Sequence, residues 1–320
     1  MKKKIVSALL CIALLMSILV VPVAATSQDN VAAFVERMYS LVLDRPSEEE
    51  GFNFWVDQLK SGQRTGAQLA EFFFLSDELE EKALDDDTFV EKLYNTLLDR
   101  PSDAGGKQEW MRRLSHNCSR AGLLRNFLMS EEFATVCEQY GIEKGDVPAR
   151  ENRDINLLTT LFVNRLYRVM LDRNSDIVGL NFWTAKMYYE NWTAIQVAEF
   201  FAFSDEMKQR NPSREEFVTM LYRAFMGREP EGGGFDYWVQ KMADGAAKEE
   251  IFNGFVTSPE FEEICKDYGV PVGDPIPVPH PGTATDPGPD PGKPTAPTDP
   301  TQPDAPPRSG DGPAPLLRAT

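Results

Sequence analysis

A four-fold internal repeat constrains the fold of this 320-residue chain more than any other feature of its sequence. The string Phe-Val-x-x-Leu-Tyr, with Met for Leu in the first copy, recurs at intervals of 55, 73 and 55 residues, starting at Phe34, Phe89, Phe162 and Phe217. Each copy continues with an arginine six residues after the tyrosine, then a glycine, and a tryptophan four residues after that glycine. Such periods are typical of repeat proteins, in which neighbouring units share a core because one unit alone buries too little apolar surface.

The four copies form two pairs. The tryptophan lies 21 residues before the next shared serine in the first and third copies, and 20 residues before it in the second and fourth. Only the second and fourth share the residues that follow, which are Cys137, Tyr140, Gly141, Gly145 and Asp146 in one and Cys265, Tyr268, Gly269, Gly273 and Asp274 in the other. We therefore predict a duplicated two-repeat module: a first module at 26–148 (repeats near 31–83 and 86–140), a linker at 149–158, and a second module at 159–274 (repeats near 159–211 and 214–268).

Each repeat is expected to form three helices and a short fourth one, so the predicted fold class is all-α. In the first copy, apolar residues at helical spacing run from Phe34 to Val42, and the proline at 46 disfavours continuation of that helix. Thr65 with Gln68, and Ser47 with Glu50, have the capping-box pattern of helix starts. Because they recur at helical spacing in every copy, the following aromatic residues are predicted to form the repeat core: Phe34, Tyr39, Trp55, Phe89, Tyr94, Trp110, Phe162, Tyr167, Trp183, Phe217, Tyr222 and Trp238.

The combined pattern, closed by Ser-x-Glu-Phe as in residues 130–133, resembles the bacterial domain of unknown function 4214 (DUF4214) family over about residues 30–274. Gly227 departs from the pattern, since the other copies have Asp44, Asp99 and Asp172, and Asn174 stands where two copies have proline. The resemblance implies a helical module, weakly similar to the linker domains that join light-harvesting pigment proteins, with no established enzymatic activity. By this analogy it favours a scaffold or adhesion role.

The two ends of the chain differ from its middle. Three lysines at 2–4, an apolar run to Val21 and the small residues at 23–25 predict a signal peptide over residues 1–25, with an uncleaved membrane anchor as the alternative. From Pro271 onward the chain holds 16 of its 23 prolines, which predicts a disordered spacer over residues 275–320. The expected protein is therefore exported, extracellular or cell-surface associated, and out of the membrane after cleavage.

Composition argues against several classes of function. The formal net charge of −17 repels nucleic acid, so no nucleic-acid partner is expected. Two histidines are too few for a metal cluster or a histidine-based triad, and we expect no cofactor, no metal site and no catalytic residue. Two alternatives stay open. One is a calcium site at Asp44, Asp99 and Asp172 with the acids three residues after each motif arginine, and the other is a secreted carboxylate-dependent hydrolase of surface polysaccharide, which would need paired acids in a cleft between the modules.

The repeated arginines and the cysteines are expected to be structural. An acidic residue follows each arginine by three positions and could pair with it, for Arg45, Arg100, Arg173 and Arg228. Three cysteines follow the predicted signal peptide, at Cys118, Cys137 and Cys265. We favour buried thiols for them, with a bridge between Cys118 and Cys137 as the alternative.

One loop breaks the repeat. Where the first copy has Lys60, Ser61 and Arg64, the third has Tyr188, Tyr189 and Trp192. Aromatic residues in a loop indicate either packing against the other module or an exposed platform for a partner. We predict a non-enzymatic extracellular or cell-surface interaction or scaffold protein, with a surface protein or polysaccharide as partner and these three residues as possible contacts.

Overall fold

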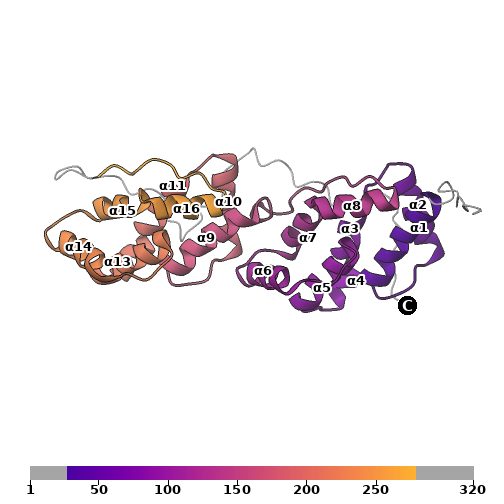
Figure 1. The fold of residues 1–320 in the computed structure, drawn as a ribbon, viewed down its shortest axis with the longest axis horizontal. Helices are drawn as coiled ribbons and strands as arrows, with labels where there is room; N and C mark the ends of the chain where they lie inside the picture. Colours follow the sequence, from indigo (N-terminus) through magenta and orange to yellow (C-terminus); the bar gives the residue numbers. More distant parts are fainter. Residues whose placement is uncertain (1–26, 279–320) are drawn as a thin grey trace, which may run out of the picture.

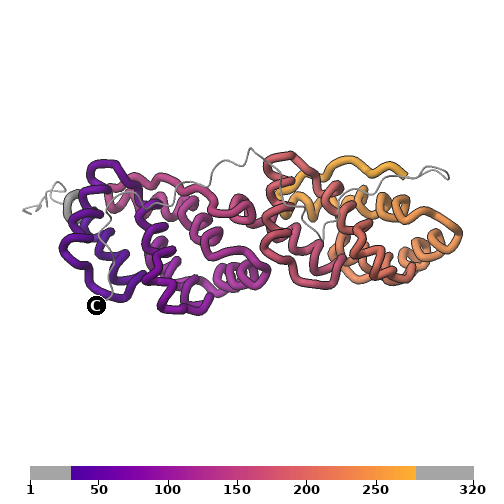
Figure 2. The backbone as a smooth tube through the Cα atoms, turned by 180° about the vertical axis from the view of Figure 1, so that it is seen from behind, coloured from indigo at the N-terminus to yellow at the C-terminus, as the bar shows by residue number. Residues whose placement is uncertain are grey.

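The computed structural model describes residues 27–278, and this part of the chain consists of helices and loops with no β-strand. The predicted signal peptide and nearly all of the predicted spacer lie outside the described residues. The helices form two groups placed end to end, α1 to α8 in one and α9 to α16 in the other (Figure 1). Seen from behind, the same two groups lie along one elongated molecule (Figure 2). The predicted all-α class with four tandem repeats is confirmed.

Each repeat contains four helices. The first repeat has α1 (Ser27–Arg37), which continues into the π-helical turn η2 (Met38–Val42), α2 (Glu49–Lys60), α3 (Gly66–Phe74) and α4 (Asp77–Glu81). The second has α5 (Asp86–Leu97), α6 (Ala104–Ser115), α7 (Arg120–Met129) and α8 (Glu131–Tyr140), and the 3-10 turn η3 (Asn152–Asp154) follows. The third has α9 (Leu157–Met170), α10 (Ile177–Tyr189), α11 (Ala194–Ala202) and α12 (Asp205–Arg210). The fourth has α13 (Arg214–Leu221) with η4 (Tyr222–Met226), α14 (Gly232–Ala243), α15 (Lys248–Val256) and α16 (Pro259–Asp267).

The fourth helix is short only in the first and third repeats. There α4 and α12 have 5 and 6 residues, whereas α8 and α16 have 10 and 9. The prediction of a short last helix in every repeat is therefore wrong for the second and fourth. The extra turns carry Cys137 and Tyr140 in α8 and Cys265 in α16, and the other residues that only these two copies share follow the helix.

Of the two capping boxes predicted from the sequence, one is present and one is not. Thr65 and Gln68 form a capping box at the start of α3. The predicted box of Ser47 with Glu50 is wrong, because α2 begins two residues after Ser47 and the Ser47 hydroxyl donates to the Glu36 carboxylate instead. A charged acceptor on the preceding helix thus takes the place of the local partner.

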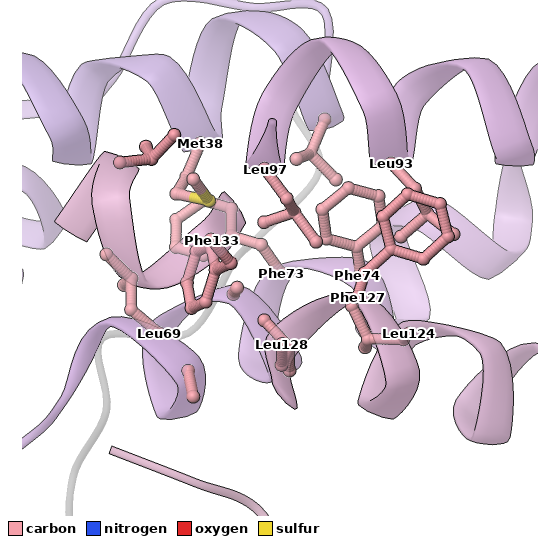
Figure 3. Packing of buried hydrophobic residues seen from close by; sticks show 14 of the residues in the cluster. Met38, Leu69, Phe73, Phe74, Leu93, Leu97, Leu124, Phe127, Leu128 and Phe133 are labelled. Carbon is pink, nitrogen blue, oxygen red and sulfur yellow. The ribbon is translucent and has the colours of Figure 1, made fainter. Parts of the chain in front are cut away.

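The two repeats of a module share one core. Phe74 of α3 lies against Phe89 of α5, with ring centroids 5.9 Å apart. Figure 3 shows side chains of both repeats meeting in the first module, among them Met38, Leu69, Phe73, Phe74, Leu93, Leu97, Leu124, Phe127, Leu128 and Phe133. Of the aromatic residues predicted as repeat core, Trp110 and Trp238 are half-buried and the other ten are buried.

The last helix of each module packs against the first helix of the same module. Tyr140 of α8 lies against Phe34 of α1, with ring centroids 5.3 Å apart. Tyr268, directly after α16, lies against Phe162 of α9 at 5.9 Å. The two repeats of a module are therefore in contact at its first and last helices as well as through the shared core.

In each module, the segment that follows the last helix runs back to the start of the module's third helix and caps it. This helix is α3 in the first module and α11 in the second. The carbonyls of Glu143 and Lys144 accept hydrogen bonds from the first two N–H groups of α3, each at 2.8 Å. The carbonyls of residues 271 and 272 do the same for α11, at 2.7 and 3.0 Å. These N–H groups have no partner inside their own helix, so the segment satisfies them. Gly145 follows with φ at 63°, and a Cβ there would lie 2.2 Å from Oγ1 of Thr65.

The folded chain continues past the predicted boundary at residue 274. Ile276 is buried, and Asn253 of α15 accepts from its N–H at 3.0 Å and donates to its carbonyl at 2.8 Å. Disorder was predicted from residue 275, and this start is too early, because one apolar residue of the Pro-rich segment finds a bonded place on α15. Among residues 27–278, none of the helices has the length and apolar character needed to cross a membrane.

Candidate functional site

The repeated arginine clamps two parts of its own repeat. The Arg45 guanidinium lies 5.0 Å from the ring centroid of Tyr39. It binds Glu78 of α4 through Nε at 2.6 Å and NH2 at 2.9 Å, and binds the predicted partner Glu48 at 2.6 Å. Charge-assisted bidentate pairs of this kind are the strong ones. The motif arginine is thus part of the scaffold.

The second and third repeats have the same bidentate arginine–glutamate pair, and in the fourth repeat the pair is looser. Glu132 and Glu206 are the bidentate partners of Arg100 and Arg173. In the fourth repeat Arg228 approaches Glu260 only to 4.0 Å, and both side chains are more exposed. The arginine lies over the motif tyrosine in all four copies.

The repeated aspartates occupy turn positions. Asp44, Asp99 and Asp172 have φ of 52°, 54° and 53°, and Gly227 has φ of 66°. Aspartate and glycine both tolerate this left-handed region, so Gly227 preserves the turn. The carboxylates of Asp44 and Asp99 bind a lysine at 2.7 Å and an arginine at 2.8 Å. In residues 27–278 no group of three or more metal-ligating side chains comes together, and the calcium alternative gains no support there.

The predicted linker at 149–158 forms a packed join between the modules. Its turn η3 lies between α7 of the first module and α9 and α10 of the second. Arg153 and Asp154 are buried within it. Arg153 binds the carboxylate of Glu151 at 2.9 Å and the carbonyl of Asn117 at 3.0 Å, while Asn181 of α10 donates to Glu151 at 2.8 Å. The join therefore ties α10 to the loop that precedes α7.

The approach of α7 to this join is close. The Ser119 hydroxyl donates to Asp154, whose pKa is raised by burial. A Cβ at Gly122 of α7 would lie 2.8 Å from Cδ2 of Leu157 and 2.9 Å from Oδ1 of Asp154. Leu157 and Leu161 at the start of α9 pack into the core of the first module, whereas the remaining buried residues of α9 pack into the second. One helix thus contributes to both cores.

The three predicted contact residues of the third repeat lie in two environments. Trp192 is half-buried and packs inside its own repeat, with ring centroids 6.2 Å from Trp183 and 5.1 Å from Phe200. Tyr188 and Tyr189 are 58% and 59% exposed, and their rings meet edge to face at 5.0 Å. Packing against the other module therefore does not describe Trp192, and the two tyrosines are free to contact a partner.

α10 exposes apolar side chains at both of its ends, and we call these four side chains the α10 face. Ile177 and Val178 are 50% and 61% exposed at its start, and Tyr188 and Tyr189 are exposed three turns later. Between the two ends, Asn181 contacts the join and Thr184 is buried. The first module has Glu49, Glu50, Lys60 and Ser61 at the four equivalent positions of α2. Our sequence reasoning missed Ile177 and Val178, although comparison with the acidic first turn of α2 would have found them.

The family comparison agrees with this division into repeats and modules. The model of a domain of unknown function, DUF4214, matches residues 24–82, 70–137, 150–210 and 198–265. The chain belongs to the DUF4214 family. Its matches overlap inside each module, at residues 70–82 and 198–210, and the gap between the modules covers residues 138–149, so the join itself falls within the third match. Comparison of this DUF4214 chain with curated proteins gives no match.

A cleft of about 620 Å³ lies at the join of this DUF4214 chain, where the hydrolase alternative would place paired acids. Its lining residues include four arginines and a single carboxylate, that of Asp172. An inverting or retaining glycosidase needs two carboxyl groups facing the scissile bond. This cleft therefore does not supply the acid pair.

The three described cysteines of the DUF4214 chain are buried and line neither the cleft nor the α10 face. All three described cysteines are buried free thiols, as the sequence favoured: Cys118, Cys137 and Cys265. Burial raises the pKa of each thiol to about 12. Such thiols are inert in the native protein, because the thiolate is the reactive form.

Proposed function

We propose that this DUF4214 chain is a non-enzymatic extracellular or cell-surface interaction or scaffold protein that holds a surface protein or polysaccharide on the α10 face, the exposed apolar side chains at the two ends of α10. The observation that carries the proposal is the exposure of four large apolar side chains on that face, where α2 has charged and polar residues. Tyrosine suits such a surface, because its ring offers apolar contact area and its hydroxyl a hydrogen bond.

The scaffold supports this role by holding the face in one orientation. α10 is bonded to the join through Asn181 and Glu151, and its core residue Trp183 packs on α11. A surface that is already ordered loses less entropy when a partner binds. The charged and aromatic groups that recur in every repeat are engaged in the clamps, which leaves the partner surface to side chains outside the motif.

The test removes the two tyrosines and leaves the scaffold intact. We compare the double variant Tyr188→Ser, Tyr189→Ser with Tyr237→Ser, which removes a tyrosine of similar exposure (56%) from α14. Binding is measured by cosedimentation with cell envelopes of the producing bacterium. We expect at least about tenfold weaker binding for the double variant, as for a central contact residue, and unchanged binding for the control.

The same assay identifies the class of partner. Envelopes treated with protease lose binding if the partner is a protein, and envelopes stripped of polysaccharide lose it if the partner is a glycan. Wild-type binding by the double variant would refute the assignment of the α10 face. Recovery of the chain only inside the cells, with residues 1–25 uncleaved, would refute the surface location.

A further inference from the structure

The cleft at the join concentrates positive charge in an acidic protein. Its wall combines Arg112 of α6 and His116 directly after that helix with three arginines from α9 and the loop after it, and Asp172 is its single carboxylate; the three are Arg165, Arg168 and Arg173. The whole chain has 33 Lys and Arg against 50 Asp and Glu, so a lining of this composition runs against the balance of the molecule. A cleft lined by one sign of charge focuses its field on the space within.

The duplication supplies an internal reference for one of these arginines. In the first module, Arg37 donates to two backbone carbonyls at the end of the next repeat's first helix and pairs with the Asp99 carboxylate at 2.8 Å. The equivalent Arg165 donates to the two equivalent carbonyls, but Gly227 stands at the position of Asp99. Arg165 is therefore held in place without a carboxylate partner among residues 27–278.

A second guanidinium of the cleft, that of Arg168, also has no carboxylate partner within the described chain. Arg168 donates through NH1 to Nε2 of His116, and Nδ1 of His116 lies 2.5 Å from the carbonyl of Arg112. The network assigns the proton to Nδ1, which donates to that carbonyl, and leaves Nε2 as the acceptor. Nε and NH2 of Arg168 remain available. The first module has Ser40 at the equivalent position, so this cation is specific to the second.

The remaining two arginines are only partly neutralised. Arg112 binds Glu109 of its own helix at 2.7 and 2.8 Å, and Arg173 binds Glu206. Each of these two arginines adds positive potential to the cleft but has its fork occupied. Like charges gathered in one concave site disfavour one another, and an anion between them removes that cost. The structure thus presents two guanidiniums without a carboxylate partner in the described chain, and Arg168 also keeps its Nε and Nη2 edge without a hydrogen-bond partner there.

We propose that this cleft binds the phosphate group of a small phosphomonoester of about the size of a sugar phosphate. Guanidinium forks match phosphate oxygens, and a monoester carries close to two negative charges at neutral pH. Leu161, Val169 and Tyr268 line the same cleft and offer an apolar and aromatic wall to the organic part of the ligand. The volume of about 620 Å³ is in the range of small-molecule sites. A long polyanion is disfavoured, because the rest of the chain is acidic.

The decisive variant restores the missing carboxylate instead of deleting a cation. Gly227→Asp places an acid where the first module has Asp99, and the backbone accepts it, since Asp99 has φ of 54° and Gly227 has 66°. The added Cβ would lie 3.7 Å from NH2 of Arg165, an ordinary contact. Arg165→Gln removes the cation itself, and Arg37→Gln is its matched control in the first module.

Binding is measured by calorimetry on the full chain at constant ionic strength, with glucose 6-phosphate, inorganic phosphate and glucose as probes. We expect glucose 6-phosphate to bind more tightly than inorganic phosphate and glucose not to bind. Gly227→Asp and Arg165→Gln should each weaken binding of glucose 6-phosphate at least about tenfold, and Arg37→Gln should leave it unchanged.

Three outcomes overturn the proposal. The first is no binding of glucose 6-phosphate to the wild type, and the second is equal loss in Arg37→Gln and Arg165→Gln, which would reflect overall charge alone. The third is undiminished binding by Gly227→Asp. Binding of inorganic phosphate as tight as that of the ester would retain an anion site but overturn the assignment of a monoester. These outcomes are separate from the envelope assay, because none of the variants changes the α10 face.

Discussion

Gly122→Ala tests whether the two modules are joined as tightly as the distances indicate. The added methyl would lie 2.8 Å from Cδ2 of Leu157 and 2.9 Å from Oδ1 of Asp154, and 3.4 Å from Cα of Asp154. Both neighbours are buried, so neither can move into solvent. Forcing a methyl into such a site costs about 1–3 kcal/mol, whereas replacing glycine by alanine inside a helix gains about 0.5–1 kcal/mol. We expect a net loss of roughly 0–2.5 kcal/mol in the free energy of unfolding.

Gly105→Ala is the matched control. Gly105 also lies in the first turn of its helix, α6, and an added Cβ would approach only Asp103, at 3.6 Å. The control receives the helical gain without the steric cost, so the difference between the two variants isolates about 1–3 kcal/mol. Urea unfolding followed by far-UV circular dichroism measures both free energies. A difference of this size corresponds to several degrees in Tm for a chain of this length.

The shape of the transition adds a second readout. If the methyl weakens the join, the modules should unfold less cooperatively, and the urea transition should broaden or separate into two steps. Equal free energies for Gly122→Ala and Gly105→Ala, with one sharp transition in each, would show that α7 and η3 do not approach one another as described.

Three further predictions follow from buried or clamped groups. Thiol reagents should label Cys118, Cys137 and Cys265 only after unfolding, because all three are buried in the native chain. Labelling of any of these thiols in the native chain would contradict their burial. Because burial raises the pKa of Asp154, the native carboxyl keeps its proton to a higher pH than the unfolded one, and wild-type stability falls as pH rises through that window. The Tm of Asp154→Asn relative to wild type should therefore rise as the pH increases above about 4, the ordinary pKa of an aspartate, and a constant difference would exclude this cause. Glu206→Gln should lower the free energy of unfolding in urea by about 1 kcal/mol, and Glu260→Gln by less than about 0.5 kcal/mol. The reason is that Glu206 binds its arginine bidentately and Glu260 does not, and equal effects would refute this difference in clamp strength.

Sequence periodicity was sufficient for the repeat and the class of fold, because both depend on spacing that the chain carries locally. Thr65 and Gln68 cap α3 by contacts three residues apart, and the sequence predicts this correctly. The main partner of Arg45 is Glu78, 33 residues away, and the sequence indicated only the nearer Glu48. Spacing identifies local partners, whereas a partner brought in by packing depends on the tertiary arrangement.

The motif glycine illustrates the same limit. In the sequence it marks only a recurring position, but a Cβ at Gly51 would lie 2.5 Å from the hydroxyl of Tyr39. The equivalent distances to the motif tyrosine are 2.3 Å at Gly106 and 2.1 Å at Gly179. The glycine is therefore required by a tyrosine 12 residues earlier that folds back on it. No local rule of turns or caps predicts this contact.

Function was harder to predict from the sequence than the fold. Comparison of equivalent residues in the two modules indicates where functional surfaces lie. The arginine over the motif tyrosine recurs in all four copies, so the departures of interest for function are those at exposed positions. Two departures concern the second module. One is the α10 face, where α2 has charged and polar residues, and the other is Gly227 of the fourth repeat, which stands in place of an acid and leaves Arg165 of α9 without a carboxylate partner among residues 27–278. α9 carries one surface, α10 carries the other, and both helices pack on η3. A ligand that moved α9 in the cleft would therefore act through η3 on the orientation of the α10 face.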